Sequence, residues 1–193
     1  MNRSSKKEEE LELLISDCLS GKPKAQYTLF KTYYGMMMNV CLRYARHRDE
    51  AKDMLNEGFI KIFGNLSQYS RTGPFEGWIK RVMANAALDY QRKYEDFSKM
   101  VAYDEIEENR PEMSYSNMAP ERLTYDELMN AIQQLPTMSK NVFNLYIFEN
   151  YSHAEIAEIL GIKEGTSHWH LNFARKKLKE RIALMNHVPA EVK

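Results

Sequence analysis

The sequence is poor in cysteine and contains no long apolar run. Its two cysteines, Cys18 and Cys41, both lie in stretches with helical periodicity. They support neither a disulfide framework nor a cysteine-based zinc site, so both are predicted to be buried structural thiols in a reducing, cytoplasmic setting. No apolar stretch approaches the roughly 18 residues that span a bilayer, and the first ten residues, MNRSSKKEEE, lack the apolar segment of a secretory signal. Direct membrane insertion and secretion are therefore not expected.

Net charge is also missing, because 27 basic residues balance 27 acidic ones. Such a balance argues against a nucleic-acid partner only where the charges are evenly mixed. Here they are not: residues 71–94 hold five basic and two acidic groups, and residues 163–193 hold seven and three. Between them, residues 95–128 hold three basic and ten acidic groups. Two basic segments thus flank an acidic one, and nucleic acid remains a candidate partner.

Alternating β-branched residues are absent, whereas apolar residues recur at helical spacing along most of the chain. The pattern predicts an all-α protein with two small helical domains, at residues 9–94 and 120–186. The stretch between them, residues 95–119, lacks this periodicity and contains Pro111, so it is predicted to be a flexible acidic linker.

Proline and glycine mark the predicted ends of the helices. Pro23 suits the first turn of a long helix, and Gly73-Pro74 separates a second helix from a third. Beyond the linker, Pro120 is predicted to open a helix that stops just before Thr137, which caps the next one.

Residues 152–179 have the pattern of a helix-turn-helix. Ser152 and Glu155 form an S-x-x-E capping box, and Gly161 supplies the left-handed residue of a tight turn. The small Ala157, four residues earlier, allows a second helix to approach closely. In such motifs the second helix lies in the major groove of DNA. The candidate DNA-contacting residues of this helix are Thr166, His168, Trp169, His170, Asn172, Phe173, Arg175 and Lys176.

Other uses of this helix remain open or are excluded. Asn172 suits adenine and the aromatic residues suit thymine methyl groups, but Trp169 and Phe173 are also typical of a protein interface. His168 and His170 diverge by about 160° around a helix, so no metal site is predicted. No cofactor and no enzymatic activity are predicted, since the sequence has no phosphate-binding glycine loop and no nucleophile elbow.

The N-terminal half combines an acidic helix face with a basic, aromatic one. In the segment 48–63, RDEAKDMLNEGFIKIF, the carboxylates of Asp49, Asp53 and Glu57 share one face. A polar loop at 65–73 leads to a helix in which basic residues alternate with aromatic ones such as Trp78. Cations and aromatic rings together suit single-stranded nucleic acid, because bases stack and phosphates require positive charge.

Taken in order, these segments resemble the extracytoplasmic-function (ECF) sigma factors of bacterial RNA polymerase. The resemblance rests on RDEAKDMLNEGFIKIF, FEGWIKRVMANAALDYQRK, LPTMSKNVFNLYIFENYSHAEIAEILGIKEGTS and ARKKLKE. It implies that residues 9–94 form sigma region 2, which binds core polymerase and the −10 element, and that residues 120–186 form region 4, which reads the −35 duplex. The implied polymerase contacts are Asp49, Asp53, Glu57 and Phe59. The residues implied to capture the melted −10 strand are Tyr69, Arg71, Trp78, Arg81, Asn85 and Arg92.

The resemblance also implies core RNA polymerase, promoter DNA and an anti-sigma factor as partners, the last often attached to the inner membrane. Members of the family commonly have a branched apolar residue at the position of Ser167 and a serine at that of Lys163, so the promoter sequence itself is not predicted. The main alternative is a free-standing helix-turn-helix repressor or activator, with residues 1–94 as a sensing or dimerisation domain. Only a sigma factor directs start-site-specific transcription by core polymerase.

Overall fold

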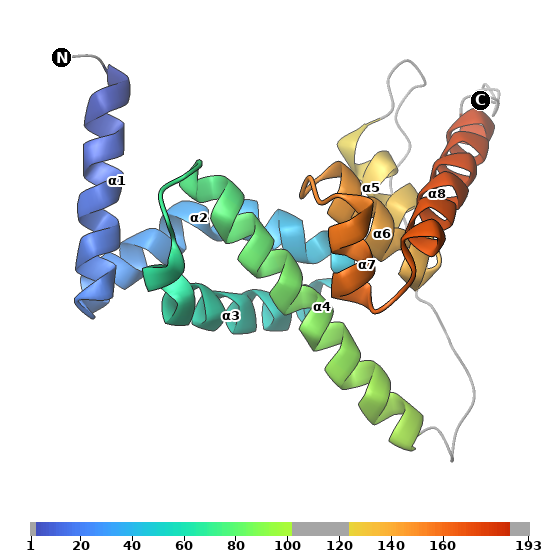
Figure 1. Ribbon diagram of the computed structural model, residues 1–193, viewed down its shortest axis with the longest axis horizontal. Coiled ribbons are helices and arrows are strands. Elements are labelled where there is room, and N and C mark those ends of the chain that lie inside the picture. Colours follow the sequence, from blue (N-terminus) through green and yellow to red (C-terminus); the bar gives the residue numbers. More distant parts are fainter. Residues whose placement is uncertain (1–2, 102–123, 186–193) are drawn as a thin grey trace, which may run out of the picture. The chain divides into compact units, whose positions relative to one another are not determined.

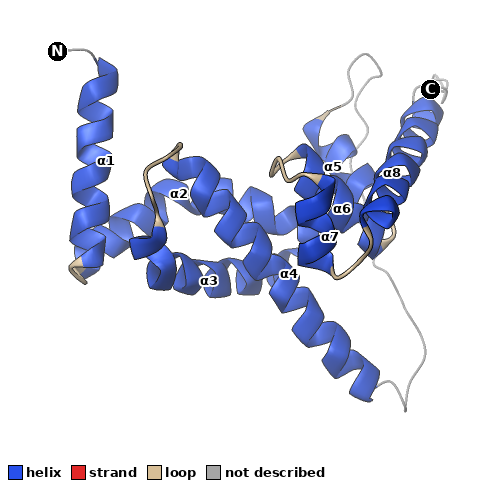
Figure 2. Ribbon diagram, viewed as in Figure 1, coloured by secondary structure: helices blue, strands red, loops and turns tan. Residues whose placement is uncertain are grey.

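The computed structural model describes residues 3–101 and 124–185, which form helices joined by short loops (Figures 1 and 2). The helices are α1 (Arg3–Leu19), α2 (Pro23–Tyr44), α3 (Arg48–Asn65), the short 3-10 helix η1 (Leu66–Gln68), α4 (Phe75–Val101), α5 (Tyr125–Gln133), α6 (Thr137–Ile147), α7 (His153–Leu160) and α8 (Glu164–Met185). No strand occurs in the described ranges, so the predicted all-α fold is confirmed. The chain divides into two compact units, Met1–Tyr90 and Gln91–Lys193.

In the first unit α2 packs against both α1 and α3, with α4 beside them (Figure 1). The core is apolar and includes Leu29, Met37, Ile62, Ile79 and Met83, each at most 1% exposed. A β-carbon on Gly58 of α3 would lie 2.1 Å from Sδ of Met83 of α4. Glycine therefore permits the close packing of these two helices. Both cysteines are buried in this unit, as predicted, and burial raises the pKa of the Cys41 thiol to about 12.

In the second unit α8 packs against α5, α6 and α7. The apolar core includes Ile132, Val142, Leu145, Ile156 and Leu171, each at most 3% exposed. Burying this much apolar surface is the main favourable contribution to the stability of such a small helical unit.

Several helix ends differ from those predicted. Helix α5 begins at Tyr125 because Thr124 forms a reciprocal capping box with Glu127, while Pro120 lies outside the described residues. The N-cap of α6 is Pro136, so Thr137 is the first residue of that helix rather than its cap. Helix α4 continues to Val101, seven residues into the predicted linker. The remainder of that linker lies outside the described residues.

Candidate nucleic-acid and polymerase interfaces

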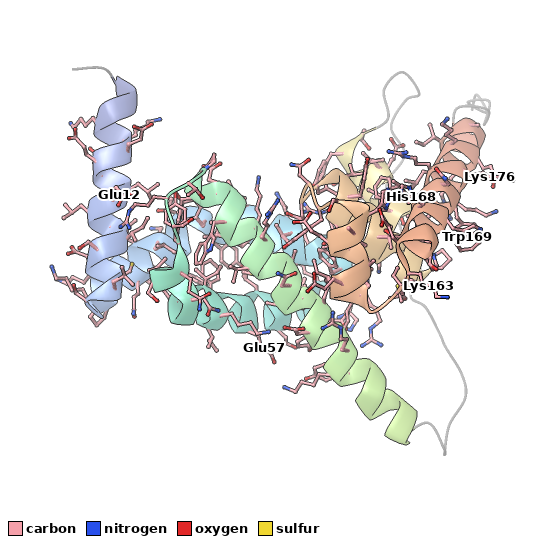
Figure 3. The ribbon with its side chains drawn as sticks, viewed as in Figure 1. Glu12, Glu57, Lys163, His168, Trp169 and Lys176 are labelled. Carbon is pink, nitrogen blue, oxygen red and sulfur yellow. The ribbon has the colours of Figure 1, made fainter. Side chains whose placement is uncertain are left out.

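The predicted carboxylate face lies along α3. Asp49 and Asp53 are exposed and Glu57 is partly exposed (Glu57 is labelled in Figure 3). Lys52 Nζ donates a hydrogen bond to Asp49 Oδ1 at 2.7 Å, which lowers the pKa of that carboxyl. The hydroxyl of Tyr90 on α4 donates to Asp53 Oδ2 at 3.4 Å. At neutral pH the face is therefore negatively charged and suited to a basic partner surface.

Phe59 does not belong to this exposed face, although it was predicted as a polymerase contact. It is 3% exposed and its ring packs against Phe30, with 4.6 Å between centroids. Its side chain leaves the helix axis in a different direction from the carboxylates. It therefore lies in the interior of the unit, behind the exposed face. Ile60 is the apolar residue on the exposed side, at 72% exposure. Its spacing of seven residues from Asp53 and three from Glu57 would have identified it from the sequence.

The loop between η1 and α4 is closed by its own contacts. Tyr69 donates its hydroxyl hydrogen bond to the carbonyl oxygen of Gly73 at 2.7 Å, and its ring meets Phe75 edge-on with 5.1 Å between centroids. Arg71 is exposed at the tip, where its backbone has a φ of 61°. Its Nε donates to Oε2 of Glu12 on α1 at 2.7 Å. The loop therefore presents a guanidinium from a constrained backbone, but one that already has a carboxylate partner.

Beside this loop, α3, η1 and α4 line an open groove of about 400 Å³. Trp78, Val82, Asn85 and Asp89 line it from α4 at helical spacing, and Lys61, Asn65 and Gln68 line it from α3 and η1. Of the six residues predicted to bind the −10 strand, Trp78 and Asn85 lie in this groove. Sequence analysis missed the opposite wall, because its residues are brought to the groove only by the packing of α3 against α4.

The groove has the chemistry to hold a nucleotide. Trp78 supplies a ring, and the amides of Asn65 and Gln68, joined by a 3.1 Å hydrogen bond, supply donors and acceptors. Lys61 Nζ pairs with Asp89 Oδ2 at 2.6 Å. Arg81 and Arg92, predicted from the same helix, are exposed on α4 outside the groove lining.

The helix-turn-helix is present as predicted in α7 and α8. Ser152 accepts a hydrogen bond from the backbone of Glu155, whose side chain in turn accepts from the backbone of Ser152, and Gly161 has the left-handed values φ 65° and ψ 35°. Leu171, Ala174 and Leu178 are buried on one face of α8. These contacts position α8 as the exposed second helix of the motif.

Behind the start of α8 lies a polar cluster, defined here as the His153 cluster: Tyr146, His153, Ser167 and His168. Ser167 is fully buried and its hydroxyl lies 2.8 Å from His153 Nδ1. The ring of His153 stacks between Tyr146, at 4.6 Å, and His168, at 3.6 Å. The buried hydroxyl of Ser167 thus has a hydrogen-bond partner in His153. Burial, followed by the charges of His168 and Arg175, lowers the pKa of His153, against the opposing effect of Glu164.

The outer face of α8 carries most of the predicted −35 residues. Trp169 is 58% exposed and its ring stacks on Phe173, with 5.3 Å between centroids. Lys177 Nζ lies 5.9 Å from the centre of the Phe173 ring. Figure 3 shows Trp169 and Lys176 on the side of α8 away from α6 and α7. The residues on this face that were predicted to contact DNA and are exposed are Thr166, Trp169, Asn172 and Lys176. His168 and Arg175 are also exposed, but they lie at the edge of α8 toward α6 and α7: His168 stacks on His153, and Arg175 Cζ lies 5.6 Å from the centre of the Tyr146 ring.

His170 points to a different neighbour. Its Nδ1 lies 2.9 Å from the Ser139 hydroxyl of α6, and partial burial lowers its pKa. The prediction of a direct base contact overlooked this partner, which tertiary packing brings to the helix. Phe173 is half-buried under Trp169 and Lys177.

The described residues, 3–101 and 124–185, contain neither a metal-binding cluster nor a membrane-spanning helix. In these ranges no group of three or more His, Cys, Asp or Glu side chains converges to hold a metal ion. No helix among them has the length and apolar character needed to cross a membrane.

Comparison with protein families places both halves of the chain. The family model described as "Sigma-70 region 2" matches residues 29–96, and that described as "Sigma-70, region 4" matches residues 125–178. Together these matches span more than half of the chain. The protein is therefore a sigma-70-type transcription initiation factor with regions 2 and 4.

Curated relatives narrow the class. The chain is 28% identical over 160 residues to the ECF RNA polymerase sigma factor SigE of Mycolicibacterium smegmatis, covering 80% of this chain and 60% of that one. It is 26% identical over 176 residues to the ECF sigma factor SigW of Bacillus subtilis, covering 87% and 94%. The chain belongs to the ECF group of RNA polymerase sigma factors.

The fold also resembles a solved sigma factor, RpoE of Bartonella quintana, whose structure was determined in complex with the anti-sigma factor NepR. The TM-score is 0.54 at 15% identity, and the match covers 82% of this chain and 96% of that one. This likeness supports the fold.

Proposed function

We propose that this chain directs core RNA polymerase to a specific set of promoters, working in the cytoplasm with the polymerase and without catalytic chemistry of its own. The observation that carries the proposal is the presence in one chain of both sigma-70 regions, in order. Each region has a surface suited to a different form of DNA. The groove of the first can enclose an unpaired base, and the exposed α8 of the second can enter a major groove.

At the −10 element the first unit captures the melted strand. Trp78 stacks on a base in the groove, Asn85 reads an edge of the base, and Tyr69 and Arg71 hold the neighbouring backbone from the loop. Arg81 and Arg92 contact phosphates along α4. Binding energy available only from the unpaired strand shifts the promoter toward the open state, which requires no ATP hydrolysis.

At the −35 element α8 lies in the major groove. Asn172 offers the donor and acceptor pair that suits adenine, and the Trp169–Phe173 stack offers an apolar surface to thymine methyl groups. Arg175 and Lys176 contact phosphates, which makes binding strongly dependent on salt.

Core polymerase binds the carboxylate face of α3, formed by Asp49, Asp53 and Glu57. Ile60, 72% exposed about one helical turn beyond Glu57, supplies apolar contact at the end of that face. An apolar contact bordered by polar and charged side chains is the usual arrangement of a protein interface. The Asp53→Lys variant is expected to weaken core binding, whereas the Thr32→Lys variant, exposed on α2, serves as the matched control.

An anti-sigma factor holds the protein inactive until a signal arrives. Support for this partner comes from the Bartonella quintana relative, which was solved with an anti-sigma factor bound. Exposed aromatic side chains such as Trp169 offer surface for such a partner.

Transcription by purified core polymerase on a library of randomised promoters tests the proposal. We expect start-site-specific transcripts only when the protein is added, and the enriched promoters identify both elements. A repressor or activator would instead bind duplex DNA alone and yield no new start sites.

The proposed contacts between side chains of α8 and bases of the −35 element are tested on the enriched promoters. Trp169→Ala and Asn172→Ala should change sequence preference in the −35 element only, by about 1–3 kcal/mol at the affected base pair. Trp78→Ala should change preference in the −10 element only. A uniform loss across all promoters for the α8 variants would instead indicate that Trp169 and Phe173 contact a protein.

A further inference from the structure

An ion pair joins α1 to the loop proposed to hold the −10 strand. Arg71 Nε donates to Glu12 Oε2 at 2.7 Å, and the two side chains are 54% and 46% exposed. Figure 3 shows Glu12 on α1. Glu12 lies outside the residues matched to sigma region 2, which begin at residue 29. The contact joins residues 59 positions apart in the sequence, so it exists only in the folded unit.

The loop around Arg71 is constrained. The Tyr69 hydroxyl bonds to Gly73, and the hydroxyls of Ser70 and Thr72 lie 2.9 Å apart. The backbone of Arg71 has a φ of 61°, a left-handed conformation that non-glycine residues rarely adopt. A residue held in this way has few alternative directions for its side chain. The guanidinium is therefore presented to α1 as well as to solvent.

A carboxylate and a phosphate accept the same type of charge-assisted hydrogen bond from a guanidinium. The pair is also half exposed, so it exchanges readily with a competing anion and contributes little to stability. Glu8, one turn before Glu12 on the same face of α1, adds negative charge on that side of the helix. A DNA strand that reaches Arg71 must displace one carboxylate and approach a second.

We propose that Glu12 is an intramolecular competitor of DNA phosphate at Arg71, so that α1 weakens the binding of single-stranded DNA to the free protein. This inference rests on the proposed contact of Arg71 with the −10 strand. It assigns to α1 a regulatory role: the first unit binds a strand firmly only where additional contacts, such as those in the groove, outweigh the Glu12–Arg71 pair.

The test compares four full-length variants binding a fluorescein-labelled, random-sequence single-stranded DNA of about 12 nucleotides, in about 50 mM salt. Glu12→Gln should raise affinity about 2- to 5-fold, the range expected from an exposed ion pair. Arg71→Ala should lower affinity and reduce the slope of log affinity against log salt by about 0.7. The Glu12→Gln/Arg71→Ala double variant should match Arg71→Ala alone.

Glu10→Gln is the matched control. It makes the same change of charge on the same helix, but Glu10 pairs with Lys6, with 3.9 Å between Nζ and Oε1, rather than with the loop. We expect its affinity to equal that of the original protein. Circular dichroism of each variant verifies that the helix content of the protein is unchanged.

Three results would overturn the inference. Lower affinity of Glu12→Gln would show that Glu12 positions Arg71 for DNA instead of competing with it. An equal gain for Glu12→Gln in the Arg71→Ala background, or for Glu10→Gln, would show a general effect of charge. An unchanged affinity of Arg71→Ala would remove the proposed DNA contact and the inference with it. Transcription with core polymerase reports separately on the proposed function, and Glu12→Gln should retain start-site specificity there.

Discussion

The two units present different shapes to DNA, and the side chains behind the two proposed DNA-binding surfaces differ, although both units have an apolar core. In the first, Trp78 and Asn85 line a concave groove backed by apolar side chains such as Ile79 and Met83. In the second, α8 is convex, and the His153 cluster lies behind its first turns. An unpaired base must be enclosed by protein, whereas a major groove itself encloses a helix. The proposed DNA forms, an unpaired strand and a duplex, account for a concave surface in the first unit and a convex one in the second. They do not account for the different side chains behind these surfaces.

This difference has consequences for stability. An apolar core, present in both units, responds to changes in volume, because closely packed side chains relax little around a cavity or an added atom. The His153 cluster of the second unit contains histidine and therefore also responds to protons. The comparison therefore predicts that truncation affects each unit separately, that added volume affects the first unit, and that acidification affects the second.

The largest expected effect is from core truncation, which tests whether the units are energetically separate. Ile62→Ala should destabilise the first unit and Ile156→Ala the second, each by about 2–5 kcal/mol, because both side chains are fully buried. The chain has two tryptophans, Trp78 in the first unit and Trp169 in the second. Urea unfolding followed by fluorescence in Trp78→Phe and Trp169→Phe backgrounds therefore reports on each unit. Equal shifts at both probes would show that the units unfold as one.

An intermediate effect is expected from added volume at the contact of α3 with α4. Gly58→Ala places a methyl group against the Met83 side chain, so Met83 must move, and we expect a loss of about 1–3 kcal/mol in the first unit. Gly35→Ala is the matched control, since a β-carbon there meets nothing within 4 Å in the interior of α2. That variant should gain up to about 1 kcal/mol from helix propensity. A gain at both positions would contradict the close packing of α3 on α4.

How far the sequence predicted this structure depends on how local each signal is. The capping box at Ser152 and the turn at Gly161 were predicted correctly, because each rests on a few neighbouring residues. Helical spacing alone already places Phe59 on a different side of α3 from the carboxylates, and only the family resemblance assigned it a polymerase contact. Its packing partner, Phe30 of α2, required the structure. The contact of His170 with Ser139 of α6 likewise could not be predicted from the sequence, because it depends on the packing of α6 against α8.

The same distinction holds for the candidate sites. One wall of the groove, with Trp78 and Asn85, follows from spacing along α4, whereas Asn65 and Gln68 reach it only through tertiary packing. The Glu12–Arg71 pair could not be predicted either, because tertiary packing brings together residues that are 59 positions apart in the sequence. Function was predictable because the order of segments along the chain identifies the family. The contacts that hold each proposed DNA-binding side chain in place could be identified only from the structure.

The smallest expected effect is a dependence of stability on pH that is confined to the second unit. Burial lowers the pKa of His153 below its ordinary value of 6.5, and it also lowers that of His170. The groups that face His153 are Tyr146 from α6 and Ser167, His168, Glu164 and Arg175 from α8. Because the folded unit binds a proton less readily than the unfolded chain, its stability is fully present above about pH 6.5 and falls as the pH decreases below that value.

Each such histidine can change the free energy of unfolding by at most about 1.4 kcal/mol per pH unit. Urea unfolding of the Trp78→Phe variant, followed through Trp169 at about pH 7.5, 6.5 and 5.5, measures this slope. His153→Gln retains a hydrogen-bonding group opposite Ser167 but does not titrate, so it should flatten the slope. His47→Gln, at the N-cap of α3 in the first unit, should leave the slope unchanged. Stability of the second unit that stays constant or rises on acidification would show that protonation of the His153 cluster carries no penalty, and the contrast between the two interiors would then concern packing alone.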